Sequence, residues 1–240
     1  MSFLGSLLFN IILYTSLPFI SAAILISYPF VSAKTLSKLA SFWIIFILKL
    51  LRLLCGLDWK VKGLSNIPKS PVIVISNHQG QWESLYLQTL IQPISSIIKQ
   101  ELLLIPFFGW ALAFMSPIPI NRKNKFQSLR KVINIANSRL NNGFSVLIFP
   151  EGTRIKPEDG IAEFSNSCGL LSVTNNIPIL PICHNSGKFW ENKKFVKKPG
   201  IINISIGPLF TGSDPKTLTN EVKDWMEKEA PKRLSAILIL

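Results

Sequence analysis

Two residues suited to proton transfer, His78 and Glu83, lie five positions apart in the segment SNHQGQWE. Histidine has a pKa of about 6.5, so it can act as a general base near neutral pH. A carboxylate beside the ring can hold one tautomer and stabilise the imidazolium that forms. In one continuous helix five residues turn by about 500°, which leaves the two side chains about 140° apart. The pair can therefore meet only if His78 lies in a turn and Glu83 in the first turn of the next helix.

The alternative for this pair is a solvent-facing histidine beside an unrelated carboxylate, because the spacing alone is not specific. A strand that ends at Ser76, a turn at Gly80 and a helix that begins at Trp82 would bring the two side chains together. Ligands of α/β sheets bind at the carboxyl ends of strands, which is where this segment is predicted to lie.

A second polar group, Glu151-Gly152-Thr153-Arg154, follows the apolar run 145–149. Glycine allows the backbone to approach a ligand, threonine offers a hydroxyl group, and arginine offers a planar fork that matches phosphate. The alternative is an exposed turn with an ordinary surface arginine. This group also follows a predicted strand, so it is predicted to lie at a carboxyl end of the sheet.

Two weaker candidates follow or occupy other apolar runs. Arg122 lies in the basic segment NRKNK, which either holds a phosphate or forms a solvated loop. Pro181 lies in the apolar run 177–182, which is predicted to be a core strand and could form a wall of a substrate pocket.

Short apolar runs alternate with helical patterns after residue 57. Strands are predicted at 71–76, 94–98, 117–120, 145–149, 177–182 and 201–206, and helices at 82–90, 126–141, 164–174 and 214–229. Near-continuous apolar strands that alternate with helices indicate an α/β fold whose mainly parallel central sheet is flanked by helices. In the last helix, Asp214 is a plausible N-cap and Pro215 suits the first helical position.

The N-terminal part differs from the rest, because no charged residue precedes Lys34. Residues 3–31 are long enough to cross a bilayer, and a cleavable signal peptide is disfavoured because the start carries no basic residue. Pro18 and Pro29 could bend this segment. Residues 39–57 form a second apolar stretch, predicted as an interfacial helix or a buried helix of the domain. We therefore predict a membrane-associated helical segment at 1–57 and an αβ domain at 58–240.

The chain carries 26 Lys and Arg against 13 Asp and Glu, a net charge of +13. Such an excess suits nucleic acid or an anionic membrane surface, and the uncharged start favours the membrane. The cations after the first segment place the rest of the chain in the cytoplasm by the positive-inside rule. Three separated cysteines and two histidines make a zinc site improbable, and the thiols are predicted to be buried and reduced.

The order of five blocks resembles the glycerolipid acyltransferases, and most of all the bacterial 1-acyl-sn-glycerol-3-phosphate acyltransferases. The blocks are NHQGQWE, KQELLLIPFFGW, PINRKN, FPEGTR and IPILPI, and the resemblance covers residues 59–210. It implies an αβ domain with an N-terminal helical membrane anchor at the cytoplasmic face of the bacterial inner membrane. No nucleic-acid-binding signature accompanies the charge.

The resemblance also implies roles. His78 and Glu83 would be the catalytic pair, and Glu151, Gly152, Thr153 and Arg154 would bind the glycerol phosphate of the acceptor with help from Arg122. Pro181 would lie beside the acyl or acceptor pocket. The donor would be an acyl thioester of coenzyme A or acyl carrier protein, the acceptor a lysophosphatidic acid, and neither metal nor bound cofactor would be needed.

Two departures from the family pattern stand out. The usual acid of the first block is Asp, whereas this chain has Glu83, one methylene longer. Members often carry a lysine after the FPEGTR block, and residues 164–169, FSNSCG, lack it. Three alternatives stay open: transfer to another lysophospholipid, transfer to glycerol 3-phosphate, and a non-catalytic membrane-binding protein.

Overall fold

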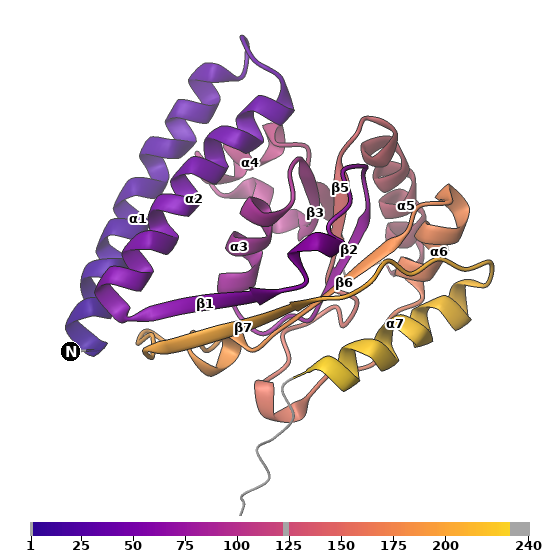
Figure 1. Cartoon of the computed structure of the whole chain (residues 1–240). Coiled ribbons are helices and arrows are strands. Elements are labelled where there is room, and N and C mark those ends of the chain that lie inside the picture. The colour runs from indigo at the N-terminus through magenta and orange to yellow at the C-terminus, as the bar shows by residue number, and fades with distance from the viewer. Residues whose placement is uncertain (1, 122–124, 231–240) are drawn as a thin grey trace, which may run out of the picture.

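The computed structural model describes residues 2–121 and 125–230, whose arrangement is shown in Figure 1. Two long N-terminal helices precede a series of strands and helices. In chain order the elements are α1 (Ser2–Ser27), α2 (Ala33–Cys55), β1 (Leu57–Lys62), β2 (Ile73–Ser76), α3 (Trp82–Leu90), β3 (Ile94–Lys99), α4 (Phe108–Phe114), β4 (Ile118–Ile120), α5 (Lys125–Asn141), β5 (Ser145–Ile148), α6 (Ser167–Asn175), β6 (Ile179–His184), β7 (Gly200–Ile206) and α7 (Pro215–Glu229).

The strands form one mixed sheet in the order β1-β7-β6-β2-β5-β3-β4. The five strands from β6 to β4 are parallel, whereas β7 runs antiparallel to β6 and pairs in parallel with β1 at the edge. The predicted α/β class with a mainly parallel sheet is confirmed. The carboxyl ends of β2 and β5 lie side by side, because Ile75 pairs with Ile148.

Alternating residues of the strands serve two hydrophobic cores. One face of the sheet, with Val74, Leu147 and Leu180, packs against α1, α2 and α3. The other face, with Ile73, Val146 and Ile179, packs against α5, α6 and α7. Burial on both faces explains why these strands read as continuous apolar runs.

All six predicted strands and four predicted helices are present, with shifts of a few residues at their ends. The cap of the last helix is confirmed, since the Asp214 carboxylate accepts a hydrogen bond from the Thr217 amide at 2.7 Å. The sequence reasoning missed β1 and α4. The edge strand β1 alternates apolar with charged residues, a strand pattern that was overlooked, whereas α4 is only seven residues long and too short for a strong periodic signal.

Helix α1 is long and apolar enough to cross a membrane by length and composition, and no other helix in the described ranges meets that test. It continues through Pro18 and ends before Pro29. It also packs along α2, as Figure 1 shows, so one side of it is covered by protein. In its most apolar window 28% of the residues are buried.

Helix α2 has two different sides. Ile47, Leu48 and Leu51 are buried in the core that includes β2, whereas Phe42 and Leu53 are more than 70% exposed. The buried side fits the prediction of a helix buried in the domain, and the interfacial role of the exposed side stays a prediction. The helix begins at the N-cap Ser32 and ends at Gly56, whose φ of +64° suits glycine.

Candidate active site

His78 and Glu83 are brought together by the turn between β2 and α3. The Asn77 side chain fixes the start of this turn, because it donates to the His184 carbonyl at 3.0 Å and accepts from the His184 amide at 3.1 Å. Glu83 is the second residue of α3, so its side chain points back toward the turn. The predicted arrangement, with His78 in a turn and Glu83 in the first helical turn, is the one observed.

The carboxylate of Glu83 is fully buried and held by four donors. His78 Nδ1 lies 2.8 Å from Oε1, and the amides of Gln79 and Gly80 donate to the same oxygen at 2.8 and 2.6 Å. The Ser186 hydroxyl donates to Oε2 at 2.8 Å. Burial by itself would raise the pKa of Glu83, but the hydrogen bonds and the neighbouring imidazoles lower this pKa below its ordinary value.

An ionised Glu83 determines which nitrogen of a neutral His78 can act as a base. The carboxylate can only accept, so Nδ1 carries the proton and Nε2 keeps its lone pair. The ring stacks on Phe149 with 4.2 Å between centroids, and its side chain is 13% exposed. His78 is thus oriented from both sides and still reaches the cavity described below.

The sequence reasoning missed two residues that support this pair, His184 and Ser186. His184 is the last residue of β6, Ser186 lies two positions further on, and both are buried. His184 Nε2 donates to the Asn77 carbonyl at 2.8 Å, and Nδ1 accepts from the Ser186 amide at 3.3 Å. Burial lowers the pKa of His184, which keeps the ring neutral. The sequence feature that could have revealed them is the polar group HNSG, residues 184–187, directly after an apolar run.

Glu151 connects the FPEGTR turn to the turn between β2 and α3, residues 77–81, which is called the catalytic turn below for the role proposed for His78. Its Oε2 accepts from the His78 amide at 2.7 Å, and its Oε1 accepts from the Ala162 amide at 3.3 Å. The Ile155 amide also donates to the His78 carbonyl at 2.8 Å. Burial raises the pKa of Glu151 to about 7. Since both oxygens contact backbone amides, this side chain fixes the position of the two turns.

The other residues of the FPEGTR turn face outward beside His78. Gly152 has a φ of +67°, and Thr153 and Arg154 are exposed. Arg154 Nε donates to the Gly80 carbonyl at 3.0 Å, and its Nη1 donates to Asn192 Oδ1 at 3.3 Å. The guanidinium group is therefore held next to the catalytic turn.

The remaining predicted site residues lie elsewhere. Arg122 falls outside the described residues. Pro181 is buried in β6, where it pairs with Ile75 and its carbonyl accepts from the Gly207 amide at 2.9 Å. It is not among the described residues that line the large cavity.

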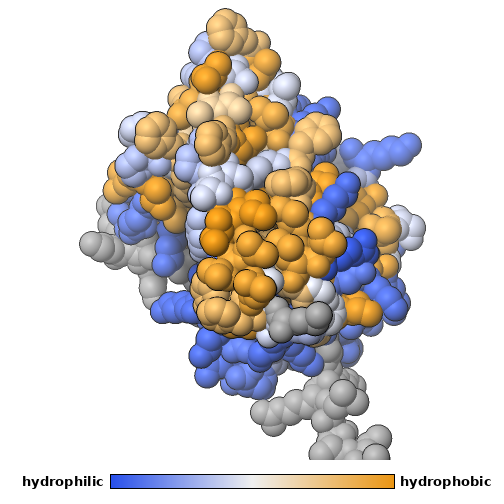
Figure 2. Space-filling model, turned by 90° about the vertical axis from the view of Figure 1, so that its left-hand side faces the viewer, coloured by the Kyte–Doolittle hydropathy of each residue, from blue (hydrophilic) through white to orange (hydrophobic). Residues whose placement is uncertain are grey.

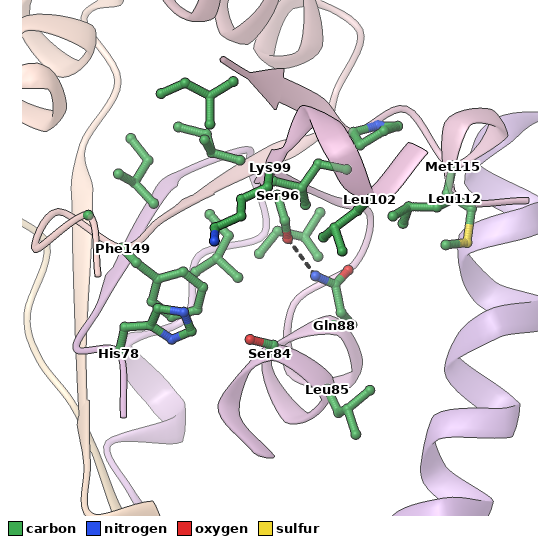
Figure 3. Close-up of a pocket in the computed structure, with 18 of the residues that line it drawn as sticks. His78, Ser84, Leu85, Gln88, Ser96, Lys99, Leu102, Leu112, Met115 and Phe149 are labelled. Atoms are coloured by element: carbon green, nitrogen blue, oxygen red, sulfur yellow. Dashed lines mark hydrogen bonds between the residues drawn. The ribbon is translucent and has the colours of Figure 1, made fainter. Parts of the chain in front are cut away.

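That cavity, of about 1340 Å³, begins at His78 and the FPEGTR turn. Its lining continues along β3 and α3 to residues of α1, α2 and α4, among them Ile24, Ala40 and Ala111. In Figure 3 the His78 ring and Phe149 lie at one end, and Leu112 and Met115 at the other. Lys99, to which the sequence reasoning gave no role, extends from β3 toward the His78 ring (Figure 3).

The segment that lacks the family lysine borders the cavity, because its residues 164–167 belong to the lining. Within residues 2–121 and 125–230, no group of three or more His, Cys, Asp or Glu could hold a metal ion. The three cysteines are free and buried, as predicted.

Fold and site together define an α/β protein in which His78, paired with the buried Glu83, lies at one end of a large, mostly apolar cavity. The family model described as Acyltransferase matches residues 58–185. A 1-acyl-sn-glycerol-3-phosphate acyltransferase of Pseudomonas aeruginosa is 40% identical over 178 residues, which cover 73% of this chain and 69% of that protein. One of Escherichia coli is 29% identical over 112 residues, 46% of this chain and 45% of that protein.

A solved structure extends the likeness to the whole fold. The crystal structure of the 1-acyl-sn-glycerophosphate acyltransferase PlsC from Thermotoga maritima matches with a TM-score of 0.78 at 22% identity, and the match covers 95% of this chain and 93% of that one. The chain belongs to the acyltransferase family. The resemblance of the five sequence blocks to the acyltransferases is therefore confirmed.

Proposed function

We propose that this protein transfers an acyl group from a thioester to the sn-2 hydroxyl of 1-acyl-sn-glycerol 3-phosphate, which gives phosphatidic acid. One observation carries the proposal: the His78–Glu83 pair, 2.8 Å apart, opens into a large apolar cavity beside the guanidinium of Arg154. The names of the relatives in Pseudomonas aeruginosa and Escherichia coli support this acceptor.

The proposed reaction is a direct transfer. Nε2 of His78 takes the proton of the acceptor hydroxyl as its oxygen attacks the thioester carbonyl. The tetrahedral intermediate collapses, the carbon–sulfur bond breaks, and the departing thiolate takes the proton from His78. Glu83 keeps the ring oriented and stabilises the imidazolium between these steps. No covalent acyl-enzyme is needed.

Arg154 is proposed to bind the phosphate of the acceptor. Two of its nitrogens are used by Gly80 and Asn192, which aim the guanidinium group and leave Nη2 and the outer face for a ligand. Arginine pairs with phosphate through a charge-assisted fork. Gly152, Thr153 and Arg122 remain proposed partners of the glycerol phosphate, whereas Glu151 is proposed to position the turn.

The cavity is proposed to hold the acyl chain. Its volume exceeds the roughly 300–1000 Å³ of ordinary small-molecule pockets, and its far end is lined by Ile20, Ile24 and Ala40 of the N-terminal helices and by α4. Burial of methylene groups contributes about 0.8 kcal/mol each. A long chain placed there would hold its carbonyl carbon near His78.

The N-terminal helices are proposed to attach the protein to the cytoplasmic face of the bacterial inner membrane. Figure 2 shows apolar side chains gathered on the face that α1 and α2 form, with hydrophilic residues around it. Exposed apolar residues on these helices include Phe3, Leu8, Ile11, Phe46 and Leu53. Lysines and Arg52 beside them can reach lipid phosphates while their stems stay in apolar surroundings.

The purified protein in vesicles tests the proposal. Lysophosphatidate, other lysophospholipids and glycerol 3-phosphate would be offered with acyl-coenzyme A and with acyl-acyl carrier protein, and products would be identified by mass spectrometry. We expect phosphatidic acid to form fastest. No transfer from either donor would point to a non-catalytic membrane protein, and faster transfer to another acceptor would replace the proposed one. The same assay identifies the donor.

A further inference from the structure

The first half of α1 carries two buried polar residues, Ser6 and Asn10, in an otherwise apolar helix. Burying such groups is unfavourable unless they are hydrogen-bonded. Both are bonded to the segment 190–198, which connects β6 to β7. Ser6 Oγ accepts from the Lys197 amide at 2.9 Å, and Asn10 Nδ2 donates to the Phe195 carbonyl at 3.3 Å.

Lys197 lies at the centre of this contact and is only 2% exposed. Its Nζ donates to Asn10 Oδ1 at 2.5 Å and to the Phe195 carbonyl at 2.9 Å. It also lies 5.0 to 5.6 Å from the ring centroids of Phe9, Trp190 and Phe195. None of the ion pairs in the described part of the chain includes Lys197. A buried ammonium group held by carbonyls and aromatic faces demands a defined geometry.

The same segment contacts the catalytic turn and Arg154. A Cβ atom at Gly80 would come within 2.7 Å of the Trp190 carbonyl oxygen, so the two backbones are in close contact. The Trp190 ring packs edge-on against Phe9 of α1 with 5.4 Å between centroids. Between these contacts, Asn192 Oδ1 accepts from Arg154. Segment 190–198 thus contacts α1 at both ends and Arg154 in between.

We propose that Lys197 is a positioning residue that fastens segment 190–198 to α1 and so holds Asn192 against Arg154. The membrane-facing helix and the phosphate-binding arginine then move as one unit. This inference rests on the proposed function, in which Arg154 binds the acceptor phosphate. Lys197 touches neither substrate, and it acts through Asn192 and the backbone around Trp190.

A double-mutant cycle with Lys197→Met and Arg154→Ala tests the proposal, with lysophosphatidate as the varied substrate. We expect Lys197→Met to raise KM about five- to tenfold and to leave kcat within about twofold. In the Arg154→Ala background the same change should raise KM by less than about twofold. Lys194→Met removes an exposed lysine from the same segment and should leave both constants unchanged.

Each outcome has one meaning. An unchanged KM in Lys197→Met, or equal factors in both backgrounds, overturns the positioning role. Thermal unfolding shows whether Lys197→Met folds. If it does not, Asn192→Ala is used instead, because it leaves the contact with α1 intact, and this variant must raise KM. An unchanged KM in Asn192→Ala also overturns the positioning role. An unchanged KM in Arg154→Ala alone contradicts the proposed phosphate site, which is a separate failure.

Discussion

The catalytic turn and the far end of the cavity are held in place by different forces. At the turn, Glu83 receives four hydrogen bonds of 2.6 to 2.8 Å in a fully buried setting. At the far end, Ile24, Leu36, Ala40 and Ala111 form an apolar cluster. Hydrogen bonds fix directions and protonation, whereas apolar packing fixes volume. Changes at the turn should therefore alter the rate, and changes at the far end should alter which acyl chain is used.

The largest effect is expected from His78→Ala, which removes the proposed base. General-base catalysis contributes about 10²- to 10⁴-fold, so we expect kcat for acyl transfer to fall about a thousandfold. Thermal unfolding and retention on vesicles should stay close to those of the unaltered protein. Turnover within tenfold of the unaltered protein would contradict the assignment and place the chemistry elsewhere in the cavity.

Glu83→Gln should have the next largest effect, because it keeps the size of the side chain and removes its charge. Its amide oxygen can still accept from Gln79 and Gly80, so the turn can persist while the imidazolium loses its stabilising charge. We expect kcat to fall about a hundredfold. Glu83→Asp retains the charge at a shorter reach and should be the more active of the two. If the glutamine variant is equally active, orientation and not charge is what Glu83 provides.

The contrast between the two regions also explains what could be predicted from sequence. His78 and Glu83 meet through a local event, a strand end followed by a turn and a helix, so local geometry could suggest the pair and the resemblance of the five blocks singled it out. Ser186 and His184 complete the same turn from about 100 positions further along the chain. No local pattern links them to Glu83, because the contact depends on the pairing of β6 with β2.

The cavity was beyond sequence reasoning for a related reason. Its walls come from α1, α2, α3, β3 and α4, and its volume is what remains after these elements pack. The short helix α4 was not predicted, and the amphipathic character of α2 left its inner side ambiguous. Pro181 lies in a run predicted to be a core strand, and it is buried in β6; the cavity lining does not include it, and its place beside a substrate pocket stays a prediction.

Leu112→Trp tests the far end of the cavity, since Leu112 points into it from α4 (Figure 3). A larger side chain there shortens the space for an acyl chain. We expect the ratio of kcat/KM for long to short acyl donors to fall about tenfold, or about 1.4 kcal/mol, with little change for the shortest donor. Ala113→Trp, on the exposed side of the same helix, is the control. Equal loss for all donors would mean that the chain lies elsewhere.

The smallest effect is expected at Glu151, which joins the two turns without taking part in the chemistry. Burial raises its pKa from 4.5 to about 7, so between these values the folded protein keeps a proton that the unfolded chain has released. Stability must therefore fall as pH rises through this window. Allowing for partial exposure, we expect a loss of about 1 kcal/mol from this group between pH 5 and 7.

Glu151→Gln removes that proton equilibrium, so the variant should lose less stability than the unaltered protein between pH 5 and 7. Urea unfolding in a mild detergent at several pH values measures the difference. Glu221→Gln, at an exposed position on α7, controls for the change of net charge. The side chain of glutamine has only one oxygen, so it cannot replace both acceptors of the His78 and Ala162 backbone amides. A loss of stability that is the same at every pH is therefore also expected. Only the slope of the unfolding free energy against pH reports the buried carboxyl group. If the variant has the same slope as the unaltered protein, water reaches Glu151 as freely as it does in the unfolded chain.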